Sequence, residues 1–196
     1  MLFCSRSDGY RQDYAKGAQF YQKVSREFNS KWKHSKTTGE LVSIYVIKNA
    51  KDPKLELRFH GTQRACKIGS GSLEPCDKEE CYLCSILKNG FSLEHANPRA
   101  MFGRGIYSSV VSSKANIYAK NHHVRSKKHV LILCGLDPGR VKNMKAAGTP
   151  GRCDSVEGLT KANGGQLAYQ ESVVYNTSRI KPIGLVVYTR KGWKPR

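Results

Sequence analysis

The segment 129–135, with the sequence HVLILCG, constrains the fold of this chain more than any other stretch. It is a continuous apolar run of strand length in a chain of which 25% of the residues are charged. A run of this kind is typical of a strand buried inside a sheet. We therefore predict a central strand here, followed by a turn at 137–139, where proline and glycine come after Asp137.

The rest of the chain shows both helical and extended patterns. Residues 13–32 repeat apolar side chains at three- and four-residue spacing, which predicts a basic amphipathic helix. Residues 41–48 alternate in the manner of a strand. Further strands are predicted at 55–60, 171–175 and 183–188, and a short strand is predicted to end at 107. Further helices are predicted at 82–88 and 112–122, and a loop is predicted at 148–158. This order predicts a single α+β domain over residues 1–196 with mainly antiparallel sheets.

Four of the seven cysteines gather in the segment 66–84. Cys76, Cys81 and Cys84 follow a Cys-x4-Cys-x2-Cys pattern, and Cys66 lies ten residues upstream. Four thiolates at this spacing suit one tetrahedral structural Zn²⁺, which would contribute folding energy rather than chemistry. Alternatively, the four are reduced cysteines that pack as small apolar side chains. The odd number of cysteines argues against a secreted disulfide framework.

The chain is strongly basic, with 34 Lys and Arg against 15 Asp and Glu and a net charge of +19. Such a charge favours anionic partners, namely nucleic acid, nucleotides or acidic protein segments. A basic surface that serves only solubility is the alternative. No apolar run approaches the roughly 20 residues that span a bilayer, and the first residues carry no signal-peptide pattern. We therefore expect an intracellular protein, cytoplasmic or nuclear, with no membrane partner.

Several residues whose side chains could take part in catalysis or binding lie at the predicted element boundaries. His60 ends a strand and is followed by a glycine. Tyr107 and Tyr118, eleven residues apart, are predicted on a strand and the following helix, where two rings could form a slot for a flat ligand. Glu171 begins a strand. Taken singly, each fits an ordinary structural role. The histidine could be hydrogen-bonded within the fold, the tyrosines could pack in the core, and the carboxylate could face solvent.

In combination these residues belong to a set of short motifs that follow one another along the chain. The motifs are His60-Gly61-Thr62, Gly90-Phe91, FGRGIY at 102–107, SKANIY at 113–118 and YQESVVY at 169–175. In this order they resemble the catalytic domain of the poly(ADP-ribose) polymerases, including tankyrase, over roughly residues 13–190. The resemblance implies an ADP-ribosyltransferase fold, with two mainly antiparallel sheets forming a split sandwich with flanking helices. It also implies an enzyme that takes NAD⁺ as co-substrate.

The resemblance assigns a catalytic triad to His60, Tyr107 and Glu171. His60 would hold the adenine-side ribose by hydrogen bonds. Gly61 would pair its backbone N–H and C=O with the nicotinamide carboxamide, and Thr62 completes this cofactor-binding motif.

The remaining roles concern the nicotinamide end of the co-substrate. Tyr107 and Tyr118 would sandwich the nicotinamide ring, and residues 92–101 correspond to the family's donor loop. Glu171 would hold the 2′-hydroxyl of the nicotinamide ribose and help position the acceptor. A protein is the first acceptor to expect and nucleic acid the second.

Two features depart from the family. Ala115 stands where many members have a serine that donates to the carboxamide, so either Ser112 or Ser113 supplies that hydroxyl or NAD⁺ binds more weakly. The cysteine-rich insertion at 66–84 follows the histidine strand, whereas tankyrase carries a similar Cys/His zinc cluster later in its sequence. The alternative function is a catalytically silent module that binds ADP-ribose or nucleic acid.

Overall fold

The computed structural model describes residues 10–12, 19–47 and 54–193, and it has the mixed α+β character that the sequence predicts. The strands are β1 Tyr10–Gln12, β2 Thr38–Ile47, β3 Glu56–His60, β4 Gln63–Arg64, β5 Ile106–Ser108, β6 Lys120–Asn121, β7 Lys128–Leu136, β8 Val141–Met144, β9 Ser155–Gly158, β10 Glu171–Val174 and β11 Ile180–Lys191. The helices are α1 Gln19–Ser30, α2 Tyr82–Asn89 and α3 Ser112–Asn116, with short 3₁₀ turns η2 Lys161–Asn163 and η3 Thr177–Arg179. None of the helices in the described ranges is both long and apolar enough to cross a bilayer.

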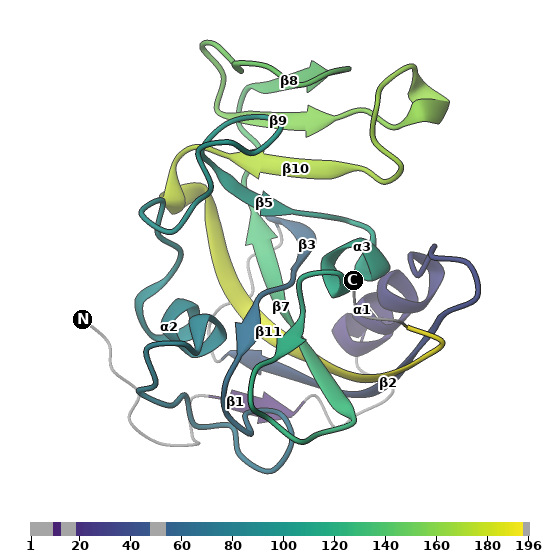
Figure 1. Ribbon diagram of the computed structural model, residues 1–196, viewed down its shortest axis with the longest axis vertical. Coiled ribbons are helices and arrows are strands. Elements are labelled where there is room, and N and C mark those ends of the chain that lie inside the picture. Colours follow the sequence, from purple (N-terminus) through teal and green to yellow (C-terminus); the bar gives the residue numbers. More distant parts are fainter. Residues whose placement is uncertain (1–9, 13–18, 48–53, 194–196) are drawn as a thin grey trace.

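The larger sheet has five strands in the order β1-β2-β11-β7-β3, and all of its neighbours run antiparallel. The predicted central strand is confirmed as β7, which α2 covers on one face and α1 with α3 on the other (Figure 1). Leu131 and Leu133 pack in one cluster with α1. Ile132 and Cys134, which alternate with them, pack in a second cluster with α2. The continuous apolar run is therefore explained by the burial of both faces.

The smaller sheet has the order β5-β10-β9-β8 and lies at the top of Figure 1. β10 runs antiparallel to β5 and β9, whereas β8 and β9 are parallel. The two sheets meet where Phe59 of β3 and Ser109 exchange backbone hydrogen bonds of 2.8 and 3.0 Å. Both sheets are open at their edges. A short parallel pair, β4 with β6, lies beside the end of β3.

Some predicted boundaries were wrong for reasons of tertiary structure. The helix predicted at 112–122 ends at Asn116, because the chain turns to pair β6 with β4. The loop predicted at 148–158 ends in strand β9, and β8 was not predicted at all. β8 is an edge strand whose first three side chains are exposed, so it lacks the alternation that marks a strand in a sequence. Residues 13–18 of the first predicted helix, and residue 48 of the following strand, lie outside the described residues.

Candidate functional site

His60 is the last residue of β3 and lies at the junction of the two sheets. Its Nδ1 is 2.8 Å from the carbonyl oxygen of Tyr107. A carbonyl can only accept a hydrogen bond, so Nδ1 carries the proton and Nε2 keeps a free lone pair in the neutral ring. Burial lowers the pKa of His60, and the hydrogen bond to Tyr107 opposes that effect. At neutral pH this imidazole is therefore an uncharged hydrogen-bond acceptor at Nε2.

Tyr107 and Glu171 share one face of the smaller sheet. In the β5–β10 pair, Tyr107 stands opposite Val173. Since side chains alternate along a strand, Glu171 lies on the same face as Val173. Glu171 is therefore a diagonal neighbour of Tyr107, at a distance that long and aromatic side chains can span. The register of two strands thus brings together a phenol and a carboxylate that are far apart in the sequence.

The phenol of Tyr107 is held by the glycine-rich turn that precedes its own strand. Its hydroxyl accepts a hydrogen bond of 2.8 Å from the N–H of Phe102 and donates one of 3.0 Å to the carbonyl oxygen of Gly103. Burial raises the pKa of Tyr107, the Phe102 N–H opposes this, and the charges of Glu171 and Tyr118 raise it further. The Tyr107 ring is thus fixed and neutral.

Tyr118 lies beyond the end of α3 with 51% of its surface exposed. Its ring centroid is 5.7 Å from Nζ of Lys114. The two tyrosines therefore differ, because the Tyr107 hydroxyl is anchored by hydrogen bonds whereas Tyr118 is half exposed with the Lys114 ammonium over its ring.

Lys114 is a site residue to which the sequence analysis gave no role. Its Nζ lies 3.0 Å from Oε1 of Glu171, and both side chains are largely buried. One ammonium thus links the carboxylate on β10 to the ring of Tyr118. No local signal could have found this pair, because its two members come from different elements and meet only through the fold.

Gly61 has a packing reason to be glycine that is independent of any ligand. A β-carbon at this position would overlap the carbonyl oxygen of Ala115 in α3. Thr62 follows, half-buried, and its carbonyl oxygen accepts a hydrogen bond of 3.4 Å from the N–H of Lys120. The His-Gly-Thr segment is therefore in close backbone contact with α3 and with the strand that follows it.

Neither serine expected to replace the missing hydroxyl at position 115 is free of structural contacts. Ser113 is fully buried, and its hydroxyl accepts hydrogen bonds from the backbone N–H groups of Lys33 and His34 at 2.8 and 3.3 Å. The hydroxyl of Ser112 donates to the carbonyl oxygen of Phe28 at 2.7 Å. Both hydroxyls hold α3 against α1 and the segment after it.

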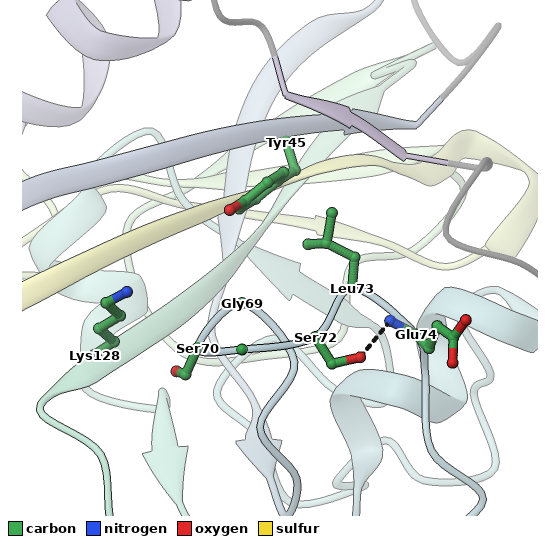
Figure 2. Close-up of a pocket in the computed structure, with 8 residues that line it drawn as sticks. Tyr45, Gly69, Ser70, Ser72, Leu73, Glu74 and Lys128 are labelled. Carbon is green, nitrogen blue, oxygen red and sulfur yellow. Dashed lines mark hydrogen bonds between the residues drawn. The ribbon is translucent and has the colours of Figure 1, made fainter.

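Two hollows lie in the described part of the chain. One, of about 570 Å³, is lined by Tyr45, Lys128 and the 69–74 segment; Figure 2 shows the Tyr45 side chain above the 69–74 loop and Lys128 to the left of it. The other, of about 400 Å³, lies between the segments 98–104 and 148–150. Neither is lined by a member of the predicted triad. The second hollow borders the turn that holds the Tyr107 hydroxyl, and it includes the end of the segment predicted to be a donor loop.

The four cysteines of the 66–84 segment, Cys66, Cys76, Cys81 and Cys84, come together in space. Their sulfur atoms all lie within 4.8 Å of one another, and none forms a disulfide. The sulfur of Cys66 is 3.5 Å from that of Cys84 and 3.8 Å from that of Cys81. Four sulfurs bound to one Zn²⁺ at about 2.3 Å would be about 3.8 Å apart, so the spacing suits a tetrahedral ion. This cluster could therefore hold a metal ion.

Backbone donors already point at these sulfurs. The N–H of Ala65 donates to Cys81 at 3.2 Å, and the N–H of Ile68 donates to Cys66 at 3.4 Å. The hydrogen bond with Cys84 is the main cause that lowers the pKa of Cys81, whereas the same hydrogen bond raises the pKa of Cys84 and burial raises that of Cys66. A thiolate is therefore stabilised in this cluster at neutral pH, which is the form that binds metal.

The cysteine cluster is connected to His60 through α2. Cys81 precedes α2 and Cys84 lies in it, and Phe91 follows two residues after its end. The ring of Phe91 meets the imidazole of His60 edge-on at a centroid distance of 5.0 Å. The position of His60 therefore depends on a helix whose start is held by the cysteines.

No protein-family model matches the chain. The geometry of the site therefore has to carry the functional interpretation. It offers a neutral imidazole acceptor, a carboxylate paired with an ammonium, and two phenol rings, one of them open to solvent. Such groups can bind ribose hydroxyls and a planar ring and can stabilise a positive charge that develops beside the carboxylate.

Proposed function

We propose that this chain is an NAD⁺-dependent ADP-ribosyltransferase. The observation that carries the proposal is the convergence of His60, Tyr107 and Glu171, which come from three strands that are distant in the sequence. His60 is hydrogen-bonded to the backbone of Tyr107, and Tyr107 shares a sheet face with Glu171. The two open, mainly antiparallel sheets that meet at Phe59 and Ser109 are compatible with the split sandwich of the ADP-ribosyltransferase fold.

In this proposal the residues divide the binding of NAD⁺ between them. Nε2 of His60 accepts a hydrogen bond from a hydroxyl of the adenine-side ribose. The backbone of Gly61 pairs with the carboxamide, and the nicotinamide ring lies between the phenols of Tyr107 and Tyr118. The high positive charge of the chain favours the approach of the anionic pyrophosphate.

The reaction follows from the same arrangement. The bond between C1′ of the ribose and the nicotinamide nitrogen breaks, and its electron pair leaves with nicotinamide. The ribose then carries positive charge as an oxocarbenium-like species, which the nearby carboxylate of Glu171 stabilises. A nucleophilic group of the acceptor bonds to C1′, and a proton that it carries passes to water. Lys114 orients the carboxylate, because its ammonium lies 3.0 Å away.

The acceptor is proposed to be a protein side chain, with nucleic acid as the second candidate. The net charge of +19 would attract acidic protein segments and nucleic acid alike. Mass spectrometry of the products formed with NAD⁺ and a mixture of protein, RNA and DNA distinguishes these acceptors. It also distinguishes transfer of one ADP-ribose from chain elongation.

The metal proposed for the four-cysteine cluster is a structural Zn²⁺. Thiolate ligands in a tetrahedral arrangement favour zinc over Mg²⁺ or Ca²⁺, which prefer oxygen. Metal analysis of the purified protein is expected to give one zinc ion per chain. A zinc-free protein with four titratable thiols in this segment would contradict the proposal.

A module that binds ADP-ribose or nucleic acid without turnover is the second candidate. Ala115 favours it, because the Ser112 hydroxyl donates to the carbonyl oxygen of Phe28 and the Ser113 hydroxyl lies 2.8 Å from Nδ1 of His34, so that both hydroxyls are engaged in docking α3. This candidate predicts binding of NAD⁺ or ADP-ribose with no release of nicotinamide.

Incubation with NAD⁺ labelled in the adenylate part decides between the two candidates. The enzyme transfers label covalently and releases nicotinamide in equal amount. We expect Glu171→Gln to lower nicotinamide release by at least about 100-fold while NAD⁺ still binds, because the stabilising charge is lost. Glu40→Gln is the matched control, since Glu40 also pairs with a lysine, Lys191 at 2.8 Å, but at an exposed position near the start of β2. Bound NAD⁺ without release of nicotinamide by the wild-type protein would favour the silent module.

A further inference from the structure

Arg64, at the end of β4, is a buried cation whose hydrogen bonds all end on neutral oxygen atoms. Only 1% of its surface is exposed. Nε donates to Oδ1 of Asn121, and Nη2 donates to the same oxygen and to the carbonyl oxygen of Lys128. Nη1 donates to the carbonyl oxygen of Ile68 and to Oγ of Ser70. The five distances are 2.6–3.1 Å. These bonds use all five donors of the guanidinium, so none is left for a carboxylate.

The other buried arginine, Arg58, shows the usual arrangement. It is 6% exposed, and its Nη2 lies 2.5 Å from Glu56 and 3.2 Å from Glu157. A buried charge without an opposite charge is strongly unfavourable. Arg64 therefore calls for a negative partner of another kind.

The cysteine cluster begins two residues after Arg64, and its thiols can supply negative charge when they are deprotonated. Cys66 follows Arg64 by two residues, and Ile68 joins both groups, since its N–H donates to the sulfur of Cys66 and its carbonyl oxygen accepts from Arg64. Burial lowers the pKa of Arg64, whereas the negative charges of Cys66, Cys81, Tyr188 and Cys84 oppose that effect. Four protonated thiols, or two disulfides, would carry no charge to balance it.

We propose that Arg64 is the internal counter-charge of a metal–tetrathiolate site, and this inference rests on the proposal that the cluster binds a metal. Four thiolates around a divalent ion carry a net charge of two minus, which one buried guanidinium halves. The site would thus take a divalent, thiophilic ion with all four cysteines deprotonated. The same arginine ties the site to β6 through Asn121, which lies three residues after Tyr118.

The proposal is tested by zinc affinity, measured by competition with a chromophoric chelator, in wild-type protein and in Arg64→Gln. We expect one zinc per chain in both, with an affinity about 10- to 100-fold lower in Arg64→Gln, as for other residues that support metal ligands. Arg58→Gln is the matched control, because it removes a buried arginine that carboxylates already balance. Its zinc affinity is expected to equal that of the wild type.

A double-mutant cycle separates charge from packing. Cys76→His reduces the net charge of the bound site from two minus to one minus, because the imidazole ligand is neutral. If Arg64 acts as a counter-charge, Arg64→Gln costs less affinity in the Cys76→His background than in the wild type. If it acts only by packing, the loss is equal in both backgrounds and the inference is overturned.

The outcomes distinguish this inference from the proposal on which it rests. Wild-type protein that binds no zinc would refute the metal site itself. If the wild-type protein binds zinc and the affinity of Arg64→Gln is within about twofold of the wild-type value, only the counter-charge role of Arg64 is refuted. That role predicts a loss of zinc affinity of at least about tenfold. Should Arg64→Gln fail to fold, recovery of a soluble, zinc-loaded Arg64→Gln/Cys76→His protein supports the counter-charge, and failure of both overturns it.

Discussion

The ammonium of Lys114 in α3 lies 3.0 Å from the carboxylate of Glu171 at the start of β10. The same ammonium lies 5.7 Å from the centroid of the Tyr118 ring. Because both charged groups are largely buried, each depends on the other for its electrostatic balance. The pair therefore sets the direction in which the Glu171 carboxylate points.

Replacement of Lys114 tests this positioning role. We expect Lys114→Met to lower the rate of nicotinamide release by about 10- to 100-fold, because the carboxylate loses the partner that orients it. NAD⁺ affinity is expected to change less than the rate. Lys114→Arg, which keeps the charge, should recover part of the rate. Steady-state measurement of kcat and KM for nicotinamide release checks both variants.

The control for Lys114 is Lys191→Met, which breaks the exposed Lys191–Glu40 pair. Its kinetics are expected to equal those of the wild type. A Lys114→Met protein with a wild-type kcat would show that Glu171 is oriented without the lysine.

Gly61 is a second position at which the fold and the proposed site coincide. In Gly61→Ala the new β-carbon would overlap the carbonyl oxygen of Ala115, so α3 has to move away from the His60 strand. We expect a loss of about 1–3 kcal/mol in the free energy of unfolding, as for other overpacked sites. NAD⁺ affinity should fall as well, because α3 carries Lys114 and leads to Tyr118. Urea unfolding and calorimetric titration with NAD⁺ measure the two effects, and unchanged values for both would contradict the close packing.

The sequence predicts the fold well where burial leaves a periodic pattern. The run at 129–135 becomes β7 because both of its faces are covered, and α2 occupies the predicted helix almost residue for residue. The end of α3 could not be predicted, because Asn116 is followed by a segment that pairs with the distant strand β4. Exposed β8 has no apolar alternation to reveal it.

The candidate site residues are a prediction from the sequence, whereas their contacts could not be predicted. The motifs single out His60, Tyr107 and Glu171 from the sequence, whereas the His60–Tyr107 hydrogen bond and the Lys114–Glu171 pair arise only from strand register and helix docking. The engagement of the Ser113 hydroxyl with residues 33 and 34 likewise depends on how α1 packs. Long-range pairs of this kind leave no local pattern in the chain.

Metal removal is expected to affect both stability and co-substrate binding. The cluster fixes the start of α2, and Phe91 beyond its end packs edge-on against His60. Cys81→Ala should therefore lose zinc, lower the melting temperature and weaken NAD⁺ binding. Cys153→Ala is the matched control, because Cys153 is a free cysteine outside the cluster. Metal analysis, thermal denaturation and calorimetric titration check the three effects, and a zinc-free Cys81→Ala protein with wild-type NAD⁺ affinity would separate the cluster from the site.

The stability of the protein is expected to fall in acid through His129 at the start of β7. Burial is the main cause that lowers its pKa to about 4, and the positive charges of Arg190 and Arg64 add to it. In the unfolded chain this imidazole has a pKa of about 6.5, so between about pH 6.5 and pH 4 the unfolded state binds a proton that the folded state does not. The free energy of unfolding therefore decreases as the pH is lowered through this range.

His129→Gln removes the titrating group and tests this expectation. The variant should lose less stability than the wild type between pH 7 and pH 5, because no imidazole at this position takes up a proton on unfolding. Urea unfolding at both pH values gives the two differences. His95→Gln, which replaces an exposed histidine in the segment before β5, is the matched control and should leave the pH dependence of the wild type intact. Equal pH dependence in His129→Gln and the wild type would show that His129 does not govern the acid response.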